Sequence, residues 1–297
     1  MDRLTSMTVF ARVAATRSFS AAARELGISQ ATASKHVQTL EGWIGARLLH
    51  RTTRRVSLTE AGESFFIQCT RILEDLEAAR QTGKPEARLR GALRVLAPIA
   101  FGSTRLAALA VDFMRENPAL SLTVTLTDRP VDLTEEGFDL AIRIGPEQSG
   151  AGHAGGLSVR QLPPVRFVVC ATPAYLKLHG LPQVPADLAR HACVTDTRHP
   201  GDVWRFAGPD GEVAVSVAGP LKTDNALLRR EAALRGAGIL MAPVFLVEED
   251  IAAGRLVQVL AGYSRPAVTQ DLVSPSQRAG SPKVRSLTAF LAARLGE

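Results

Sequence analysis

The sequence is poor in cysteine, and its three cysteines form no recognisable pair. Cys69, Cys170 and Cys193 are odd in number, widely spaced and without a Cys-x-x-Cys motif. Because disulfide frameworks need an even and closely patterned set, we expect reduced thiols in a cytoplasm. A redox switch between two of these thiols is the alternative that the spacing leaves open.

Long apolar runs are also absent. No stretch approaches the ~18 consecutive apolar residues of a membrane-spanning helix, and the N-terminal residues lack the apolar core of a signal peptide. Hydrophobic residues make up 46% of the chain, which fits a soluble globular protein. We therefore expect a cytoplasmic protein with no membrane partner.

Motifs for catalysis, nucleotide binding and metal binding are missing or incomplete. No P-loop and no Gly-x-Ser-x-Gly elbow occurs. Gly150, Gly152 and Gly155 match the dinucleotide fingerprint by letter, but a Pro-Glu pair precedes them and the strand-like LSVRQL follows, so a loop is predicted. His191 and Cys193 are too few for a metal site. We expect no cofactor, no metal and no enzymatic activity. A carboxylate cluster without a partner base is expected to be solvated: Asp128, Asp132, Glu135, Glu136 and Asp139.

Positive charge is concentrated in the first third of the chain. Residues 1–90 carry 14 Lys and Arg against 9 Asp and Glu, whereas the whole chain of 297 residues carries 35 against 29. Nearly all of the net charge of +6 therefore lies there. Such a distribution is typical of a protein with one nucleic-acid-binding domain.

Residues 4–16 predict a helix with an inward apolar face, and residues 18–59 predict two short helices, a tight turn and a basic hairpin. The first helix covers 21–26, with Ser20 available as N-cap and Gly27 as its end. Ser29 is the expected cap of a second helix from Gln30 to about Glu41. One face of that helix is apolar, at Ala33, Val37, Leu40 and Ile44. The other face is small or polar and suits a major groove, at Gln30, Ala31, Ser34, Lys35 and Gln38.

Two short strands, 48–51 and 56–59, would flank a wing that carries three arginines. Arginine at such a tip can enter a narrow minor groove or bind phosphate. Taken alone, the helices could be a hairpin in some core and the arginines a solvated charge run. Their adjacency favours DNA binding.

The segment SFSAAARELGISQATASKHVQTLE, followed by LLHRTTRRVSLTEAG, resembles the N-terminal domain of LysR-type transcriptional regulators. Looser similarity continues through FDLAIRIG, GAGILMAP, GRLVQVL and SPKVR. The resemblance implies double-stranded DNA as partner, read by a recognition helix at 30–41 and a wing at 51–55. The implied DNA-binding residues are Gln30, Ala31, Thr32, Ser34, Lys35, Gln38, Arg51, Thr53, Arg54 and Arg55.

A long helix from Glu60 to about Gln81, capped by Thr59, is predicted next. Its apolar residues step by three and four in a narrow seam of the coiled-coil kind. Packing on its own domain is one interpretation. The family resemblance favours a dimerising linker helix in a homodimer or homotetramer, through Phe65, Cys69, Ile72 and Leu76.

From Gly91 onward, strands and helices alternate in a βαβ pattern that predicts a parallel sheet. Strands are expected at 93–97, 120–127 and 138–144, with a helix at 102–116. A second set follows, with strands near Arg166 and at 212–217 and 239–241, a helix at 225–236 and a closing helix at 283–295. Near Ala267 the chain is expected to cross back to the first set.

By resemblance, these two sets form a two-lobed sensor like periplasmic binding proteins. The expected fold is α/β, with a winged helix-turn-helix (1–59), a linker helix (60–88) and an effector-binding domain (89–297). Within that domain, lobe 1 would span about 91–163 plus 266–297, and lobe 2 about 164–265.

A small-molecule effector is expected where strands of the lobes end. The loop 98–103 leads into a helix N-terminus, which favours anions. However, no hydroxyl residue precedes Ser103 in it, as one does in many relatives, and this points to a more apolar effector or none. The candidate residues are Pro98, Ile99, Ala100, Phe101, Ser103, Arg143, Thr195 and Asn225.

The sequence thus predicts a sequence-specific regulator of the LysR type that responds to an effector. One rival is a solute-binding or enzymatic α/β domain fused to a basic DNA-binding domain, which would need a secretion signal or a nucleophile–base set. A second rival is an architectural protein that binds all DNA equally. The polar residues on the second helix favour base readout over that rival.

Overall fold

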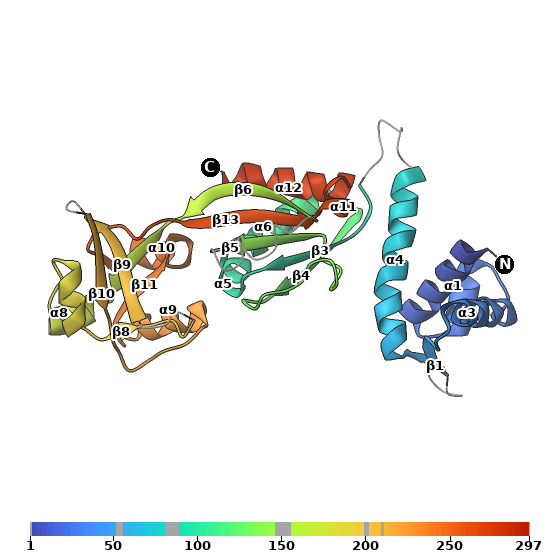
Figure 1. The fold of residues 1–297 in the computed structure, drawn as a ribbon, viewed down its shortest axis with the longest axis horizontal. Coiled ribbons are helices and arrows are strands. Elements are labelled where there is room, and N and C mark those ends of the chain that lie inside the picture. Colours follow the sequence, from blue (N-terminus) through green and yellow to red (C-terminus); the bar gives the residue numbers. More distant parts are fainter. Residues whose placement is uncertain are drawn as a thin grey trace. The chain divides into compact units, whose positions relative to one another are not determined.

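The computed structural model describes residues 2–51, 56–80, 89–145, 156–198, 202–208 and 211–296. The chain forms two compact units, Met1–Arg88 and Leu89–Glu297, and Figure 1 shows the order of their elements. The predicted wing tip at 52–55 and the glycines at 150–155 lie outside the described residues.

The first unit contains three helices, a two-stranded hairpin and a long helix. Its elements are α1 (Arg3–Thr16), α2 (Phe19–Leu26), α3 (Gln30–Ile44), β1 (Leu49–Arg51), β2 (Val56–Leu58) and α4 (Glu60–Arg80). All six correspond to elements that the sequence predicts. β1 and β2 pair in antiparallel fashion, with Leu49 opposite Leu58.

Local capping explains where the helices of this unit begin and end. Ser18, not Ser20 as predicted, is the N-cap of α2, because its Oγ accepts a hydrogen bond from Ala21 N at 3.2 Å. Ser29 caps α3 as expected, accepting from Thr32 N at 3.0 Å. Between them, Gly27 has a φ of +66°, a left-handed conformation that glycine adopts without strain.

The core of this unit is centred on Phe10 of α1, which is fully buried. Its ring lies 5.5 Å from that of Phe65 and 6.3 Å from that of Phe66, both on α4. Truncation of such a side chain to alanine typically costs about 3–5 kcal/mol of stability. The other buried residues of the cluster come from all parts of the unit, and include Val13, Ala22, Ala33, Val37, Leu40, Leu48 and Cys69.

Helix α4 approaches the hairpin closely at one point. A side-chain carbon placed on Gly62 would lie 1.9 Å from the carbonyl oxygen of Leu48. The same oxygen accepts a hydrogen bond from Thr59 N at 3.0 Å. Thr59 also caps α4 as predicted, since its Oγ1 accepts from Gly62 N at 2.9 Å.

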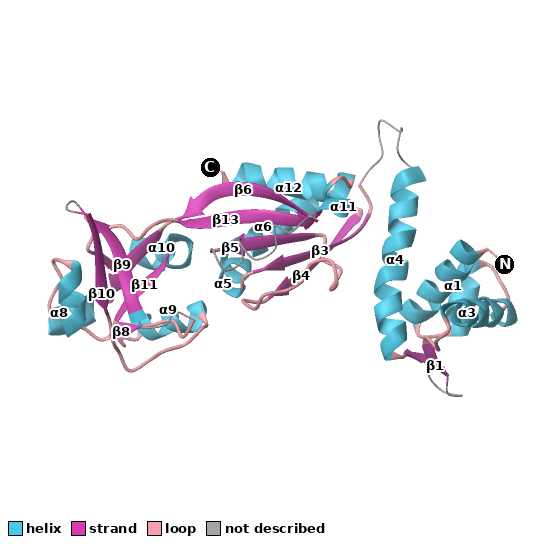
Figure 2. Ribbon diagram, viewed as in Figure 1, coloured by secondary structure: helices cyan, strands magenta, loops and turns pink. Residues whose placement is uncertain are grey.

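The second unit is built on two sheets, which we call lobe 1 and lobe 2 (Figure 2). Lobe 1 has the strand order β4-β3-β5-β13-β6, and lobe 2 the order β12-β7-β11-β8. The elements of lobe 1 are β3 (Gly91–Ala97), α5 (Ile99–Phe101), the π-helix η1 (Gly102–Leu106), α6 (Ala107–Glu116), β4 (Leu120–Leu126), β5 (Leu140–Ile144), β6 (Leu157–Val165), β13 (Val268–Pro275), α11 (Ser276–Ala279) and α12 (Pro282–Leu295). Those of lobe 2 are β7 (Phe167–Ala171), α8 (Pro173–His179), the 3-10 helix η2 (Pro185–Arg190), β8 (Cys193–Val194), β9 (Val203–Gly208), β10 (Gly211–Ser216), α9 (Ala226–Leu234), β11 (Ile239–Pro243), α10 (Val244–Ala252) and β12 (Val257–Val259).

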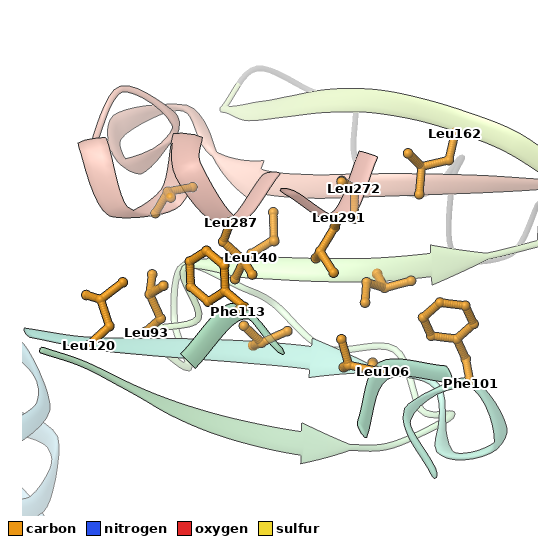
Figure 3. Close-up of a cluster of buried hydrophobic side chains, with 14 residues drawn as sticks. Leu93, Phe101, Leu106, Phe113, Leu120, Leu140, Leu162, Leu272, Leu287 and Leu291 are labelled. Atoms are coloured by element: carbon orange, nitrogen blue, oxygen red, sulfur yellow. The ribbon is translucent and has the colours of Figure 1, made fainter. Parts of the chain in front are cut away.

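In lobe 1, β3 runs parallel to β4 and β5, as the alternating pattern predicts. Figure 3 shows the core between this sheet and its helices, where Leu287 and Leu291 of α12 and Phe113 of α6 lie over Leu93 and Leu140. β13 and β6 extend the sheet in antiparallel fashion. In lobe 2, β8 runs parallel to β11, while the predicted strand at 212–217 pairs instead with β9 in a separate hairpin.

Two expectations for lobe 1 are wrong. Residues 98–103, predicted as a loop, are largely helical, because Ile99 N donates to Asp128 Oδ1 at 3.2 Å and Gly102 N to Pro98 O at 2.8 Å. Asp139, predicted to be solvated, is buried. It pairs with Arg278 at 2.7 Å and accepts from the backbone of Arg94, which satisfies its charge inside the protein.

Candidate functional site

Helix α3, the predicted recognition helix, separates a buried face from an exposed one, as its sequence predicts. Ala33, Val37 and Leu40 are at most 1% exposed. Ile44 packs partly buried against the same cluster. The predicted base-reading positions Gln30, Ala31, Lys35 and Gln38 are exposed, and Ser34 is half-buried. These exposed positions all belong to the first nine residues of the helix.

Side-chain contacts hold α3 against α1 and stabilise its N-terminus. Ser6 of α1 is buried, and its Oγ lies 2.9 Å from Nδ1 of His36. At the N-terminus, the Oγ of Ser29 lies 2.8 Å from Oγ1 of Thr32. Thr32, one of the predicted DNA-binding residues, is thus engaged with the helix cap in this structure. Of the predicted wing, only the backbone of Arg51, the last residue of β1, is described.

The predicted seam of α4 divides between core and surface. Cys69 is fully buried in the unit's own core, where its Sγ donates to Met7 O at 3.4 Å, and Phe65 packs against Phe10. These contacts match the interpretation that the helix packs on its own domain. Farther along, Ile72 and Leu76 are 46% and 39% exposed, one helical turn apart. Of the four predicted seam residues, Ile72 and Leu76 are the ones whose apolar side chains a second copy could cover.

The predicted effector residues between 98 and 103 differ in their exposure to solvent. Phe101 is 2% exposed, and its ring lies edge-on to Phe245 of α10 at 5.4 Å, so it offers no apolar surface to a ligand. Ala100 is likewise buried. Pro98 and Ile99 are half-buried, and Ser103 is exposed on η1. Two residues further on, Arg105 forms an ion pair with Glu248 of α10 at 2.6 Å, so this segment joins the two lobes.

The other predicted effector residues come from both lobes. Arg143 lies in lobe 1 opposite Asp271 in the sheet, and burial lowers its pKa, an effect that the charges of Asp132 and Asp271 partly offset. Asn225 caps α9, its Oδ1 accepting from Leu228 N at 2.9 Å. Thr195 is 1% exposed, and its hydroxyl has no hydrogen-bond partner among the described residues.

Sequence reasoning missed a group of charged residues at the end of β8. Asp196 is buried and accepts from Nε and Nη2 of Arg198 at 3.1 and 2.9 Å. It also pairs with Arg229, which reaches it from α9. Arg265, from the segment that leads back to lobe 1, stacks on Phe167 with its guanidinium carbon 4.3 Å from the ring centre. The three arginines are far apart in sequence, and no local motif marks them.

Burial and the neighbouring arginines have opposite effects on the pKa of Asp196. Burial alone raises the pKa of the Asp196 carboxyl, but hydrogen bonds from Arg198 and the charge of Arg229 outweigh it and lower the pKa to about 2. Asp196 is therefore ionised at neutral pH. Asp128 of lobe 1 adds a negative charge that acts on both Arg198 and Arg229.

The described part of the chain contains neither a cluster of metal ligands nor a membrane-spanning helix. There, no three His, Cys, Asp or Glu side chains converge as metal ligands would. None of the described helices combines the length and apolar composition needed to span a bilayer.

Two family models match the chain, each over one of its compact units. Residues 4–63 match the bacterial regulatory helix-turn-helix protein of the lysR family, and residues 86–296 match the LysR substrate binding domain. The first match covers α1 to the start of α4, and the second covers both lobes.

Known regulators resemble the chain over nearly its whole length. The regulator DmlR of Escherichia coli is 36% identical over 97% of this chain and 93% of its own. The regulator CrgA of Neisseria meningitidis is 34% identical over 98% and 96%. The solved structure of CrgA, a LysR-type transcriptional regulator, covers 99% of both chains with 32% identity and a TM-score of 0.64. Full-length AphB, a virulence activator of Vibrio cholerae, covers 99% of this chain and 100% of its own at 26% identity and a TM-score of 0.62. The chain thus has a helix-turn-helix domain followed by a LysR substrate binding domain, and it belongs to the LysR family of DNA-binding transcriptional regulators.

Proposed function

We propose that this regulator recognises a specific operator by placing the N-terminal half of α3 in the major groove. The observation that supports this proposal is that Gln30, Ala31, Lys35 and Gln38 are exposed, whereas the apolar residues of the same helix are buried. Glutamine can bind adenine through two hydrogen bonds, and lysine can reach guanine or phosphate. Such contacts distinguish base pairs, which an architectural protein does not do.

The basic hairpin would add binding strength with less sequence information. In this proposal, Arg51, Thr53, Arg54 and Arg55 bind phosphate or enter the minor groove beside the recognition helix. Thr32 and Ser34 would contribute at the edge of the major groove, once Thr32 exchanges its contact with Ser29 for one with DNA.

Replacing one residue of each kind tests this division. Gln30→Ala should cost about 1–3 kcal/mol of binding free energy on the cognate operator and relax the preference at one base pair. Arg54→Ala should weaken binding to cognate and random DNA evenly and flatten the dependence of affinity on salt. Binding to both DNAs is measured over a salt series. If both variants lose equally on cognate and random DNA, Gln30 does not read bases.

The two-lobed domain supports an effector site at the edge where its parallel strands end. Of the predicted residues, Pro98, Ile99, Ser103, Arg143 and Asn225 stay in this proposal. Thr195 is buried but also stays, because its hydroxyl has no hydrogen-bond partner among the described residues. Ala100 and Phe101 are left out, because both pack in apolar clusters. Ser103→Ala and Thr195→Val should each reduce the transcriptional response in a reporter assay and leave operator affinity intact. A full response in both variants would place the effector elsewhere.

The remaining parts of the proposal concern assembly and compartment. The exposed residues Ile72 and Leu76 on α4 support a homodimer or homotetramer held by the linker helices. Because its target is chromosomal DNA, the regulator would act in the cytoplasm.

A further inference from the structure

We infer that Arg229 and Arg265 form a subsite of lobe 2 for an oxyanion, so that the effector carries a carboxylate, phosphate or sulfate group. The inference rests on the proposed effector function of this domain and adds the chemical class of its ligand. It differs from the apolar effector that the sequence of 98–103 favours.

Topology places both arginines at the same edge of the lobe 2 sheet. Arg265 stacks on Phe167, the first residue of β7, and Phe167 is paired with Pro243 at the C-terminal end of β11. Arg229 pairs with Asp196, two residues after β8 ends. Since β8 and β11 are parallel, their C-terminal ends lie together. Open α/β sheets bind their ligands at this edge.

Charge pairing at this edge is incomplete. The carboxylate of Asp196 already forms ion pairs with Arg198 and Arg229. Arg265 has no carboxylate within ion-pair distance among the described residues. The Nε of Arg229 is buried and likewise lacks a hydrogen-bond partner there. A buried N–H donor without an acceptor is unfavourable unless a ligand or water supplies one.

The two guanidinium groups also act on each other. Burial lowers the pKa of Arg265, and the positive charge of Arg229 lowers it further, with only Asp196 opposing. Burial likewise lowers the pKa of Arg229. An anion bound between them would neutralise this repulsion. Guanidinium groups bind carboxylate and phosphate through paired hydrogen bonds, which suits such a ligand better than a neutral one.

Thr195 is a neighbour in sequence but not part of this subsite. The side chain of Cys193 belongs to the apolar cluster that contains Phe206. The side chain of Val194 belongs to a different apolar cluster, which contains Ala233 of α9. Residues alternate between the faces of an extended segment, so Thr195 lies on the face of Cys193 and Asp196 on that of α9. The side chain of Asp196 therefore meets Arg229, whereas the hydroxyl of Thr195 points away.

Arg265→Met tests the subsite, because methionine keeps an apolar stem over Phe167 and removes the charge. The matched control is Arg235→Met, which removes an exposed arginine of the α9 C-terminus that pairs with Glu231. The full-length protein is titrated with malonate, sulfate and phosphate at constant ionic strength, with chloride as the reference salt, and thermal unfolding is followed. We expect a saturable rise in melting temperature for wild type and for Arg235→Met. For Arg265→Met, affinity should fall at least tenfold.

In chloride alone, Arg265→Met should melt at or above wild type, because it removes a charge that repels Arg229. Arg265→Lys, which keeps the charge but loses the forked donors, should fold and bind the same anions more weakly than wild type. The absence of a saturable response in wild type, or equal affinities in wild type and Arg265→Met, would overturn the inference.

Operator binding, measured on the same samples without added oxyanion, separates this inference from the proposed function. Specific binding by wild type together with no anion response overturns the anion subsite alone. Equal binding to operator and random DNA overturns the proposed DNA readout, whatever the anion titration shows.

Discussion

The carboxylate of Glu41 on α3 accepts hydrogen bonds from the backbone N–H groups of Leu48, at 2.9 Å, and Leu49, at 3.2 Å. The contact links the recognition helix directly to the strand that leads into the wing. Because backbone atoms of β1 are held by a side chain of α3, the two proposed DNA-binding elements keep a fixed relation to each other.

Replacement of Glu41 by alanine should therefore impair both folding and DNA binding. Two part-buried N–H groups would lose their acceptor, which typically costs about 1–3 kcal/mol of stability. Urea unfolding of the isolated residues 1–88, or of the full chain, measures that loss. Glu41→Gln keeps an acceptor oxygen and should lose clearly less; equal losses in the two variants would show that the hydrogen bonds matter little.

Ile72→Asp should abolish self-association if the exposed half of α4 is the dimer interface. An aspartate there would bury an unpaired charge between two helices, which is strongly unfavourable. The matched control is Ile67→Asp, because Ile67 is also exposed but lies on another face of α4. Analytical ultracentrifugation should find only the first variant monomeric, with weakened operator binding. A fully dimeric Ile72→Asp would place the interface elsewhere.

The three thiols should resist modification in the native protein. Cys69, Cys170 and Cys193 are all free and buried, and burial raises the pKa of each to about 12. Since the thiolate is the reactive form, a disulfide reagent at pH 8 should react slowly with native protein and quickly with three thiols in guanidinium. A rapidly reacting native thiol would revive the redox switch that the sequence leaves open.

Stability should depend on pH through Asp196. Its folded-state pKa of about 2 lies below the unfolded value, so its contribution is present above about pH 4 and is lost as the pH falls towards 2. A shift of this size corresponds to about 2 kcal/mol. Asp196→Asn should lower stability at pH 7 and flatten its decline between pH 4 and 2, as followed by urea unfolding. An unchanged acid profile would contradict the role of this carboxylate.

Local signals were sufficient for much of the fold and for the separation of α3 into a buried and an exposed face. Periodicity and caps predicted α1, α3 and α4 closely, because Ser29, Thr59 and the apolar positions of α3 act within a few residues of themselves. The cap of α2 was misplaced because Ser18 and Ser20 are equally good caps by type, and only the path of the chain after α1 selects Ser18.

Long-range contacts account for the errors. The helical start of α5 depends on Asp128, which lies 29 residues away, and burial of Phe101 depends on Phe245. The arginines around Asp196 come from α9 and from the crossing to lobe 1, so that only the folded sheet brings them together. Likewise, burial of Cys69 depends on its contact with Met7 of α1, 62 residues away.

The close approach of Gly62 to Leu48 has a mechanical consequence. Leu48 is held by Glu41 of α3 through its N–H group and by Thr59 through its carbonyl oxygen, while Gly62 leaves no room between α4 and that oxygen. The first turn of α4 cannot rotate or slide without displacing β1, and β1 cannot move without α3. A rotation of the first turn of α4 should therefore carry β1 and α3 with it, and the methyl group of Gly62→Ala should push α4 away from Leu48.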